Sequence, residues 1–203
     1  MDEAVVSLKS IVGKEDSALL RMLGIRSEHR RIPDTIRTTR GDEIDFLAYV
    51  DEPGRRPLLK HVEIRTSKDP QMTNDMLARY AAIWRWSSGR PELENAYISP
   101  MVVYLGSARW KPKTVIDESQ LYFKHDFVSV RDMDPGPFLE SGNLGDVAFA
   151  VLCRGGLRPN VLKKAVERIA SASAEERQAA VASLVALSDL RGIGDQARAR
   201  MSA

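Results

Sequence analysis

The chain has 203 residues, of which 43% are hydrophobic and 29% charged, and its formal net charge is +2. This composition is typical of a globular protein, and the length predicts one domain with an appended subdomain. The overall charge gives no argument for nucleic-acid binding, and no apolar run reaches the ~20 residues that a membrane span needs. The first residues resemble no signal peptide. We therefore expect a cytoplasmic protein without membrane association.

The first predicted element is a helix over residues 17–23, which Gly24 ends. A strand is expected over residues 31–39, inside an arginine-rich stretch. These arginines have two interpretations. They form either a solvated basic edge that discourages strand association, or a track for the phosphates of DNA. The residues concerned are Arg30, Arg31, Arg37 and Arg40.

Two strands over residues 43–50 and 58–65 are expected to pair as a hairpin around the turn at Pro53 and Gly54. Each alternates apolar and polar side chains, which point to opposite faces of a strand. With the apolar faces on a core, the carboxylates of Asp45 and Glu63 rise on the same outward side. His61 and Arg65 share the face of Glu63.

The two carboxylates also have two interpretations. They are either the solvent face of an ordinary antiparallel sheet or the ligands of a hard divalent ion. Mg²⁺ prefers oxygen ligands and commonly takes one or two carboxylates while keeping several waters.

The remaining elements complete an α/β fold. A helix is expected over residues 72–87, a buried strand over 97–105, a loop over 109–119 in which Trp110 to Lys113 could contact nucleic acid, and a strand over 121–130. Helices follow over residues 144–153, 159–170 and 173–190, and residues 196–203 are expected to fray. We predict a mixed sheet of about five strands flanked by helices in residues 1–134, with residues 135–203 as a helical extension packed on that core.

The hairpin and the following helix resemble the PD-(D/E)XK nuclease superfamily, and within it the Rpn-like family of recombination-promoting nucleases and related transposase-like proteins. The similar motifs are Asp45-x-Leu47-x-x-Val50, Val62-Glu63-Ile64-Arg65 and Arg79-Tyr80. The strand at 101–106 and the segments 138–144 and 147–152 are similar too. The resemblance extends from Ile32 to the helices after Gly156.

The resemblance implies a restriction-endonuclease-like fold and Mg²⁺-dependent (or Mn²⁺-dependent) cleavage of DNA, linked to recombination or a mobile element. It implies that Asp45, Glu63 and the carbonyl of Ile64 hold the metal. Arg79 matches a family position as an auxiliary residue. DNA is then the expected partner, contacted by the four arginines and Lys68, and a homodimer is a possible assembly.

Arg65 departs from the family pattern, which has Lys or Gln at this position. Arginine can neutralise charge on a phosphate, but it stays protonated near neutral pH and cannot be a general base. His61 or Lys68 would take that role. The alternative function is a catalytically inactive nuclease-fold module that binds nucleic acid or a protein partner.

Overall fold

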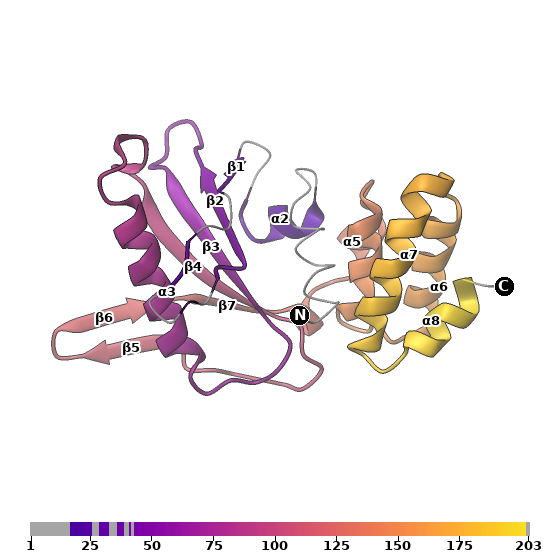
Figure 1. Ribbon diagram of the computed structural model, residues 1–203. Helices are drawn as coiled ribbons and strands as arrows, with labels where there is room; N and C mark the ends of the chain where they lie inside the picture. Colours follow the sequence, from indigo (N-terminus) through magenta and orange to yellow (C-terminus); the bar gives the residue numbers. More distant parts are fainter. Residues whose placement is uncertain (1–16, 26–28, 33–35, 39–40, 42, 202–203) are drawn as a thin grey trace. The chain divides into compact units, whose positions relative to one another are not determined.

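A computed structural model describes residues 17–25, 29–32, 36–38, 41 and 43–201, and the chain divides into two compact units (Figure 1). We call them the sheet unit and the helical unit. The sheet unit comprises Glu28–Tyr104 and Arg109–Val128. The helical unit comprises Met1–Ser27, Leu105–Ala108 and Ser129–Ala203.

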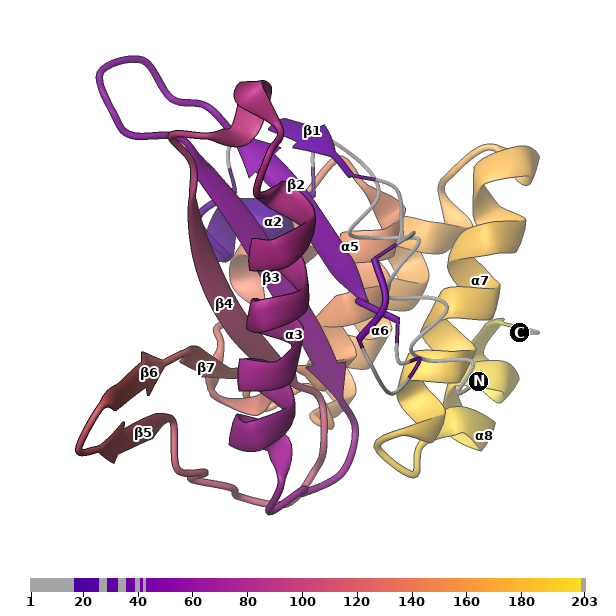
Figure 2. The same cartoon turned by 60° about the vertical axis from the view of Figure 1, so that its left-hand side comes forward.

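The sheet unit contains a mixed sheet, as the α/β prediction requires. The strands follow the order β1-β2-β3-β4-β7, and they span His29–Arg31, Phe46–Val50, Leu58–Arg65, Tyr97–Tyr104 and Asp126–Ser129. β2 is antiparallel to both β1 and β3, whereas β3 and β4 are parallel. The parallel pair is joined through α3 (Met72–Ser87), which lies across one face of the sheet (Figure 2).

The predicted hairpin is formed by β2 and β3. Phe46 pairs with Val62 and Val50 with Leu58, and Gly54 in the connecting turn has a φ of +77°, a conformation that glycine adopts without steric cost. The antiparallel β2 on one side and the parallel β4 on the other make β3 an interior strand.

The face of the sheet under α3 has an apolar core. Leu47 and Leu59 from the hairpin pack in one cluster with Ile83 of α3, and Met76 of α3 packs with Val102 of β4 in a second cluster. Each fully buried side chain of this kind contributes about 1.5–3 kcal/mol. Side chains of one strand alternate between its two faces, so His61 and Glu63 lie beneath α3 on the same face as Leu59.

The strand prediction at the start of the sheet unit needs correction. The strand expected over 31–39 is instead β1, which ends at Arg31, although the Ile32 amide still donates to Leu47. Residues 33–35 and 39 of the expected range lie outside the described residues. Further on, Arg37 forms only an isolated bridge with Glu43.

The stretch expected to be a loop contains β5 (Val115–Glu118), which pairs with β6 (Leu121–Lys124) in a separate two-stranded sheet. The strand expected over 121–130 is interrupted at His125, whose amide donates to Thr114. The small sheet is anchored because Phe123 packs edge-on against Tyr80 of α3, with ring centroids 5.5 Å apart.

Trp110 is part of the sheet unit's aromatic core. Its ring packs against Tyr104 at 5.0 Å and Phe127 at 5.4 Å between centroids. These contacts give the partly buried Trp110 a packing role.

Short helices build the helical unit. Ser173 caps α7, because its hydroxyl accepts from the Glu176 amide and donates to the Glu176 carboxylate at 2.7 Å. The expected fraying after residue 196 is wrong, since α8 continues to Met201. The helices are α2 (Ala18–Met22), α4 (Gly136–Leu139), α5 (Leu144–Phe149), α6 (Pro159–Ala170), α7 (Ala174–Asp189) and α8 (Gly194–Met201). Single 3-10 turns span Pro91–Leu93, Val130–Asp132 and Ala150–Leu152.

Asp146 of α5 joins the N-terminal helix to this unit. Its buried carboxylate accepts hydrogen bonds from the hydroxyls of Ser17 and Ser141 and from the Ala18 amide, at 2.6–2.8 Å. Of the described residues, 17–25 group with the C-terminal helices, whereas the sequence predicts a single boundary at residue 134.

Arg191 closes the C-terminal side of the same unit. Its guanidinium donates to the carbonyl oxygens of Leu105 at 2.7 Å and of Leu152 at 2.6 Å. Cys153 is buried, and burial raises the pKa of its thiol to about 12, which disfavours the reactive thiolate. Within the described part of the chain, none of the helices combines the length and apolarity that a bilayer crossing requires.

Candidate functional site

Glu63 lies near the end of β3, on the face that α3 covers. Its side chain is 1% exposed, and His61, on the same face, is 0% exposed. The expectation that these side chains point to solvent is wrong. Val62 and Ile64 on the opposite face are buried as well, so alternation along this interior strand does not separate core from solvent.

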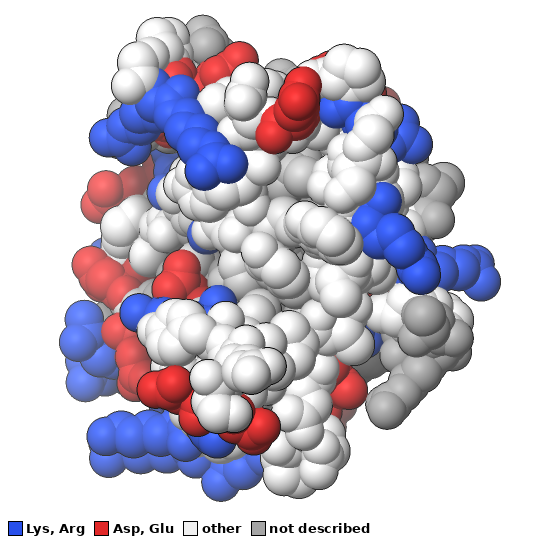
Figure 3. Space-filling model, turned by 90° about the vertical axis from the view of Figure 1, so that its left-hand side faces the viewer, with Lys and Arg blue, Asp and Glu red and all other residues white. Residues whose placement is uncertain are grey.

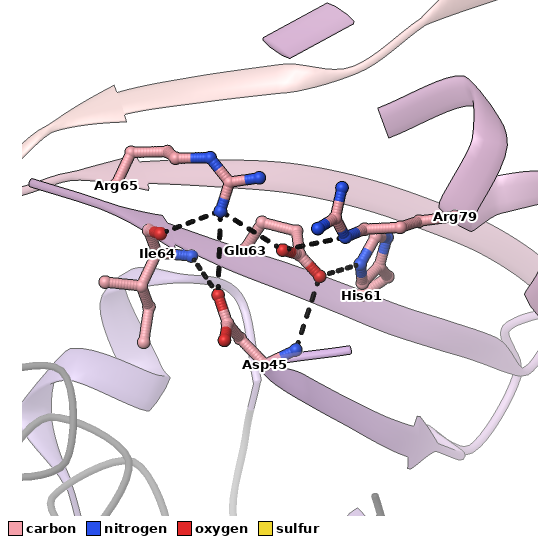
Figure 4. Close-up of polar contacts among 6 residues, drawn as sticks. All are labelled: Asp45, His61, Glu63, Ile64, Arg65 and Arg79. Atoms are coloured by element: carbon pink, nitrogen blue, oxygen red, sulfur yellow. Dashed lines mark hydrogen bonds and ion pairs between the residues drawn. The ribbon is translucent and has the colours of Figure 1, made fainter. Parts of the chain in front are cut away.

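Four nitrogen groups surround the Glu63 carboxylate (Figure 4). Its Oε1 is 2.8 Å from His61 Nε2 and 3.3 Å from the Asp45 amide nitrogen. Its Oε2 is 3.3 Å from Arg65 Nη1 and 3.1 Å from Arg79 Nε. The Arg79 contact is an ion pair without hydrogen-bond alignment. Three of the four contacts are hydrogen bonds, so about three of the roughly four acceptor positions of the carboxylate are used.

These neighbours keep Glu63 ionised. Burial alone would raise the pKa of the carboxyl, but the hydrogen bond and charge of His61, followed by the charges of Arg79 and Arg65, outweigh burial and lower it. A buried carboxylate at neutral pH is stable only with such partners.

Asp45 occupies a bend immediately before β2, where the regular strand alternation is lost. Ile44 consequently packs in the cluster of Leu47, whereas regular alternation would place it on the same face as Phe46. The Asp45 side chain is 17% exposed, and its Oδ2 accepts from the Ile64 amide at 2.9 Å. The carboxylate is therefore fixed beside the end of β3.

Arg65 bends back over the two carboxylates. Its Nη1 donates to the Ile64 carbonyl at 2.9 Å and lies 3.3 Å from Glu63 Oε2 and 3.8 Å from Asp45 Oδ2 (Figure 4). The three oxygen groups expected to hold a metal thus surround a single cationic nitrogen.

This donor set fits a hard cation, because it consists of two carboxylates and one backbone carbonyl. Among the described residues, no three His, Cys, Asp or Glu side chains are grouped so that they could hold a metal ion. A metal here would therefore need the carbonyl and waters to complete its shell, as Mg²⁺ commonly does.

Comparisons with protein families, curated proteins and solved structures find no match. The resemblance to nucleases accordingly depends on the motif residues and on the site that they form.

His61 does not suit the role of general base. Its Nε2 is engaged by Glu63, and its Nδ1 is buried with no hydrogen-bond partner among the described residues. Lys68, the other candidate, is exposed after β3. Arg79 is buried against Glu63, so it positions this carboxylate.

His125 is a buried polar residue to which the sequence assigns no role. Its Nε2 is 3.4 Å from the Thr73 hydroxyl at the start of α3, and its Nδ1 is 2.9 Å from the Asp126 carbonyl. Burial lowers the pKa of His125, with a smaller contribution from the charge of His61. No metal-ligand spacing in the sequence signals it.

The arginines expected to bind DNA differ in their contacts. Arg30 is exposed in β1 and lies over the Tyr49 ring at 5.8 Å, and exposed Arg37 forms an ion pair with Glu43. Only the backbone of Arg31 is described, and Arg40 lies outside the described residues. In the face shown in Figure 3, Lys and Arg lie mainly toward the margins, near acidic side chains.

Proposed function

We propose that this chain is a Mg²⁺- or Mn²⁺-dependent DNA endonuclease with a restriction-endonuclease-like sheet unit, acting in the cytoplasm in recombination or on a mobile element. The observation that supports this function is the convergence of Asp45, Glu63 and the Ile64 carbonyl on one cation position. An antiparallel hairpin followed by a helix and a parallel strand supports the fold assignment.

Each of these residues has a distinct role in the proposal. Asp45, Glu63 and the Ile64 carbonyl hold the ion, which when bound neutralises phosphate charge and lowers the pKa of a water. Arg79 and His61 hold the Glu63 carboxylate in place. Arg65 is the cation that can stabilise charge on the scissile phosphate, and Lys68 is the remaining candidate for proton transfer.

A plasmid-nicking assay with Mg²⁺, Mn²⁺ or EDTA tests this function. Asp45→Asn is the informative variant, because an amide oxygen can still accept from the Ile64 amide while the ligand charge is removed. We expect nicking to fall by at least about 100-fold, a range typical for removing one strong electrostatic contribution. Asp51→Asn, an exposed carboxylate just after β2, is the matched control and should nick normally. Equal nicking by Asp45→Asn and wild type would show that this site is not responsible.

The alternative is a catalytically inactive module that binds nucleic acid or a protein. The position of Arg65 favours it, because a guanidinium already contacts every oxygen group of the cation position. DNA binding by the wild type without nicking under any metal condition would support this alternative over the enzyme.

A further inference from the structure

Arg65 is the most exposed cation in contact with Glu63. Its side chain is 18% exposed, compared with 10% for Arg79, and His61 is fully buried. The fourth partner, the Asp45 amide, belongs to the backbone. Of the four groups that contact the carboxylate, Arg65 is the long side chain with the greatest exposure, and it can rotate away while the strands stay in place.

The charges of the site make this movement a condition for metal binding. Asp45 and Glu63 carry two negative charges, and Arg65 and Arg79 carry two positive charges, so the group is formally neutral without His61. A divalent ion entering this arrangement meets a formally neutral site and a carboxylate that already has four nitrogen contacts. Departure of Arg65 leaves a net negative charge among Asp45, Glu63 and Arg79 and removes one of the two cations beside Glu63 Oε2.

A phosphate diester offers Arg65 an alternative partner. Guanidinium binds phosphate oxygens with two parallel hydrogen bonds, and such a pair compensates for leaving the Ile64 carbonyl and the two carboxylates. Phosphate and metal then favour the same rotated position of Arg65, so each strengthens the binding of the other.

We propose that Arg65 serves as an internal counter-ion which keeps divalent metal out of the site until a nucleic-acid phosphate draws the guanidinium away. The inference rests on the proposed function, because it concerns the metal position of that site. Metal binding and DNA binding then depend on each other. Arginine in place of the family's lysine is explained by its control of metal entry.

Direct metal binding tests the inference without any measurement of cleavage. The loss of the free Mn²⁺ electron paramagnetic resonance signal is followed for the full chain, alone and with a short phosphorothioate duplex that resists hydrolysis, and the Mn²⁺ bound by the duplex alone is subtracted. For the wild type we expect weak Mn²⁺ binding that tightens at least tenfold with the duplex. For Arg65→Gln we expect tight binding without the duplex and less than about a twofold further gain.

Two further variants control the measurement. Arg55→Gln removes an exposed arginine that pairs with Glu52 in the same unit, and it should keep the wild-type response. Arg65→Lys retains the charge on a side chain without the guanidinium fork and should bind Mn²⁺ alone with intermediate affinity. If Arg65→Gln folds poorly, the Mn²⁺ affinity of Arg65→Lys still tests the counter-ion role.

The outcomes separate the inference from the proposed function. Tight Mn²⁺ binding by wild type without DNA, or the same duplex effect in Arg65→Gln, overturns the counter-ion role and leaves the metal site in place. Failure of wild type and both Arg65 variants to bind Mn²⁺, with or without the duplex, overturns the metal site itself.

Discussion

Arg79 Nε lies 3.1 Å from Glu63 Oε2, and both side chains are buried between α3 and the sheet. This pair links the helix that follows the hairpin to the strand that carries the candidate site. Removing one member of a buried pair leaves the other charge without compensation, which is more costly than breaking a surface ion pair.

We therefore expect Arg79→Ala to lower the free energy of unfolding by about 3–5 kcal/mol in urea titrations. Glu63→Ala should be similarly destabilised, because three cationic or imidazole groups lose their acceptor. Arg55→Ala, which breaks an exposed pair, should cost only about 0–1 kcal/mol. Equal stability of Arg79→Ala and Arg55→Ala would contradict a structural role for the buried pair.

The lowered pKa of Glu63 predicts a pH dependence of stability. Its folded-state pKa lies below the ordinary value of 4.5, so its contribution is fully present above about pH 4.5 and is lost as pH falls through the folded-state pKa. In urea titrations from neutral to acidic pH, the free energy of unfolding should fall more steeply for wild type than for Glu63→Gln. Parallel curves for the two proteins would mean that Glu63 has no shifted pKa.

Asp146 should be important for the helical unit. Replacement by alanine leaves the Ser17 and Ser141 hydroxyls and the Ala18 amide without this acceptor, and each buried unsatisfied group costs about 1–3 kcal/mol. We expect a loss of at least about 3 kcal/mol in urea unfolding and faster hydrogen exchange in α2. Asp189→Asn, which affects the exposed pair with Arg198, is the matched control and should change stability by less than about 1 kcal/mol.

The arginine-rich segment predicts salt-dependent DNA binding. Glutamine at Arg30, Arg31, Arg37 and Arg40 should weaken binding to any DNA sequence, and the log–log salt slope should fall by roughly 0.9 for each phosphate that the variant no longer neutralises. Arg37 is expected to contribute least, because Glu43 already compensates its charge. Binding curves at several salt concentrations measure the slopes. An unchanged slope in the fourfold variant would direct the search for DNA-binding residues to other cations.

The elements with strong periodicity could be predicted from the sequence. α3 matches the range 72–87 because its apolar stripe repeats at helical spacing, and β3 matches 58–65 because it alternates over eight residues. β5 was missed because four residues after a Pro-Lys segment give too short a pattern. The end of α8 was missed because the Arg198 pairs with Asp189 and Asp195 support a helix of low apolar content.

The proximity of Asp45, Glu63 and Arg65 could be predicted from the sequence, whereas the burial around them could not. Asp45, Glu63 and Arg65 do meet, as their places on the hairpin suggest. The burial of Glu63 depends on its partner Arg79, sixteen residues later, and local alternation cannot reveal that pairing. The inward turn of Arg65 likewise follows from the bend at Asp45, which brings a second carboxylate within reach.

The hydrogen bonds from Ser17 and Ala18 to Asp146 have a consequence for synthesis on the ribosome. The Ala18 contact spans 128 positions, and the entire sheet-unit sequence is translated between its two ends. At about 5–20 residues per second, α2 waits roughly 6–26 s for its buried acceptor. The sheet unit therefore has time to fold before α2 meets its acceptor in α5.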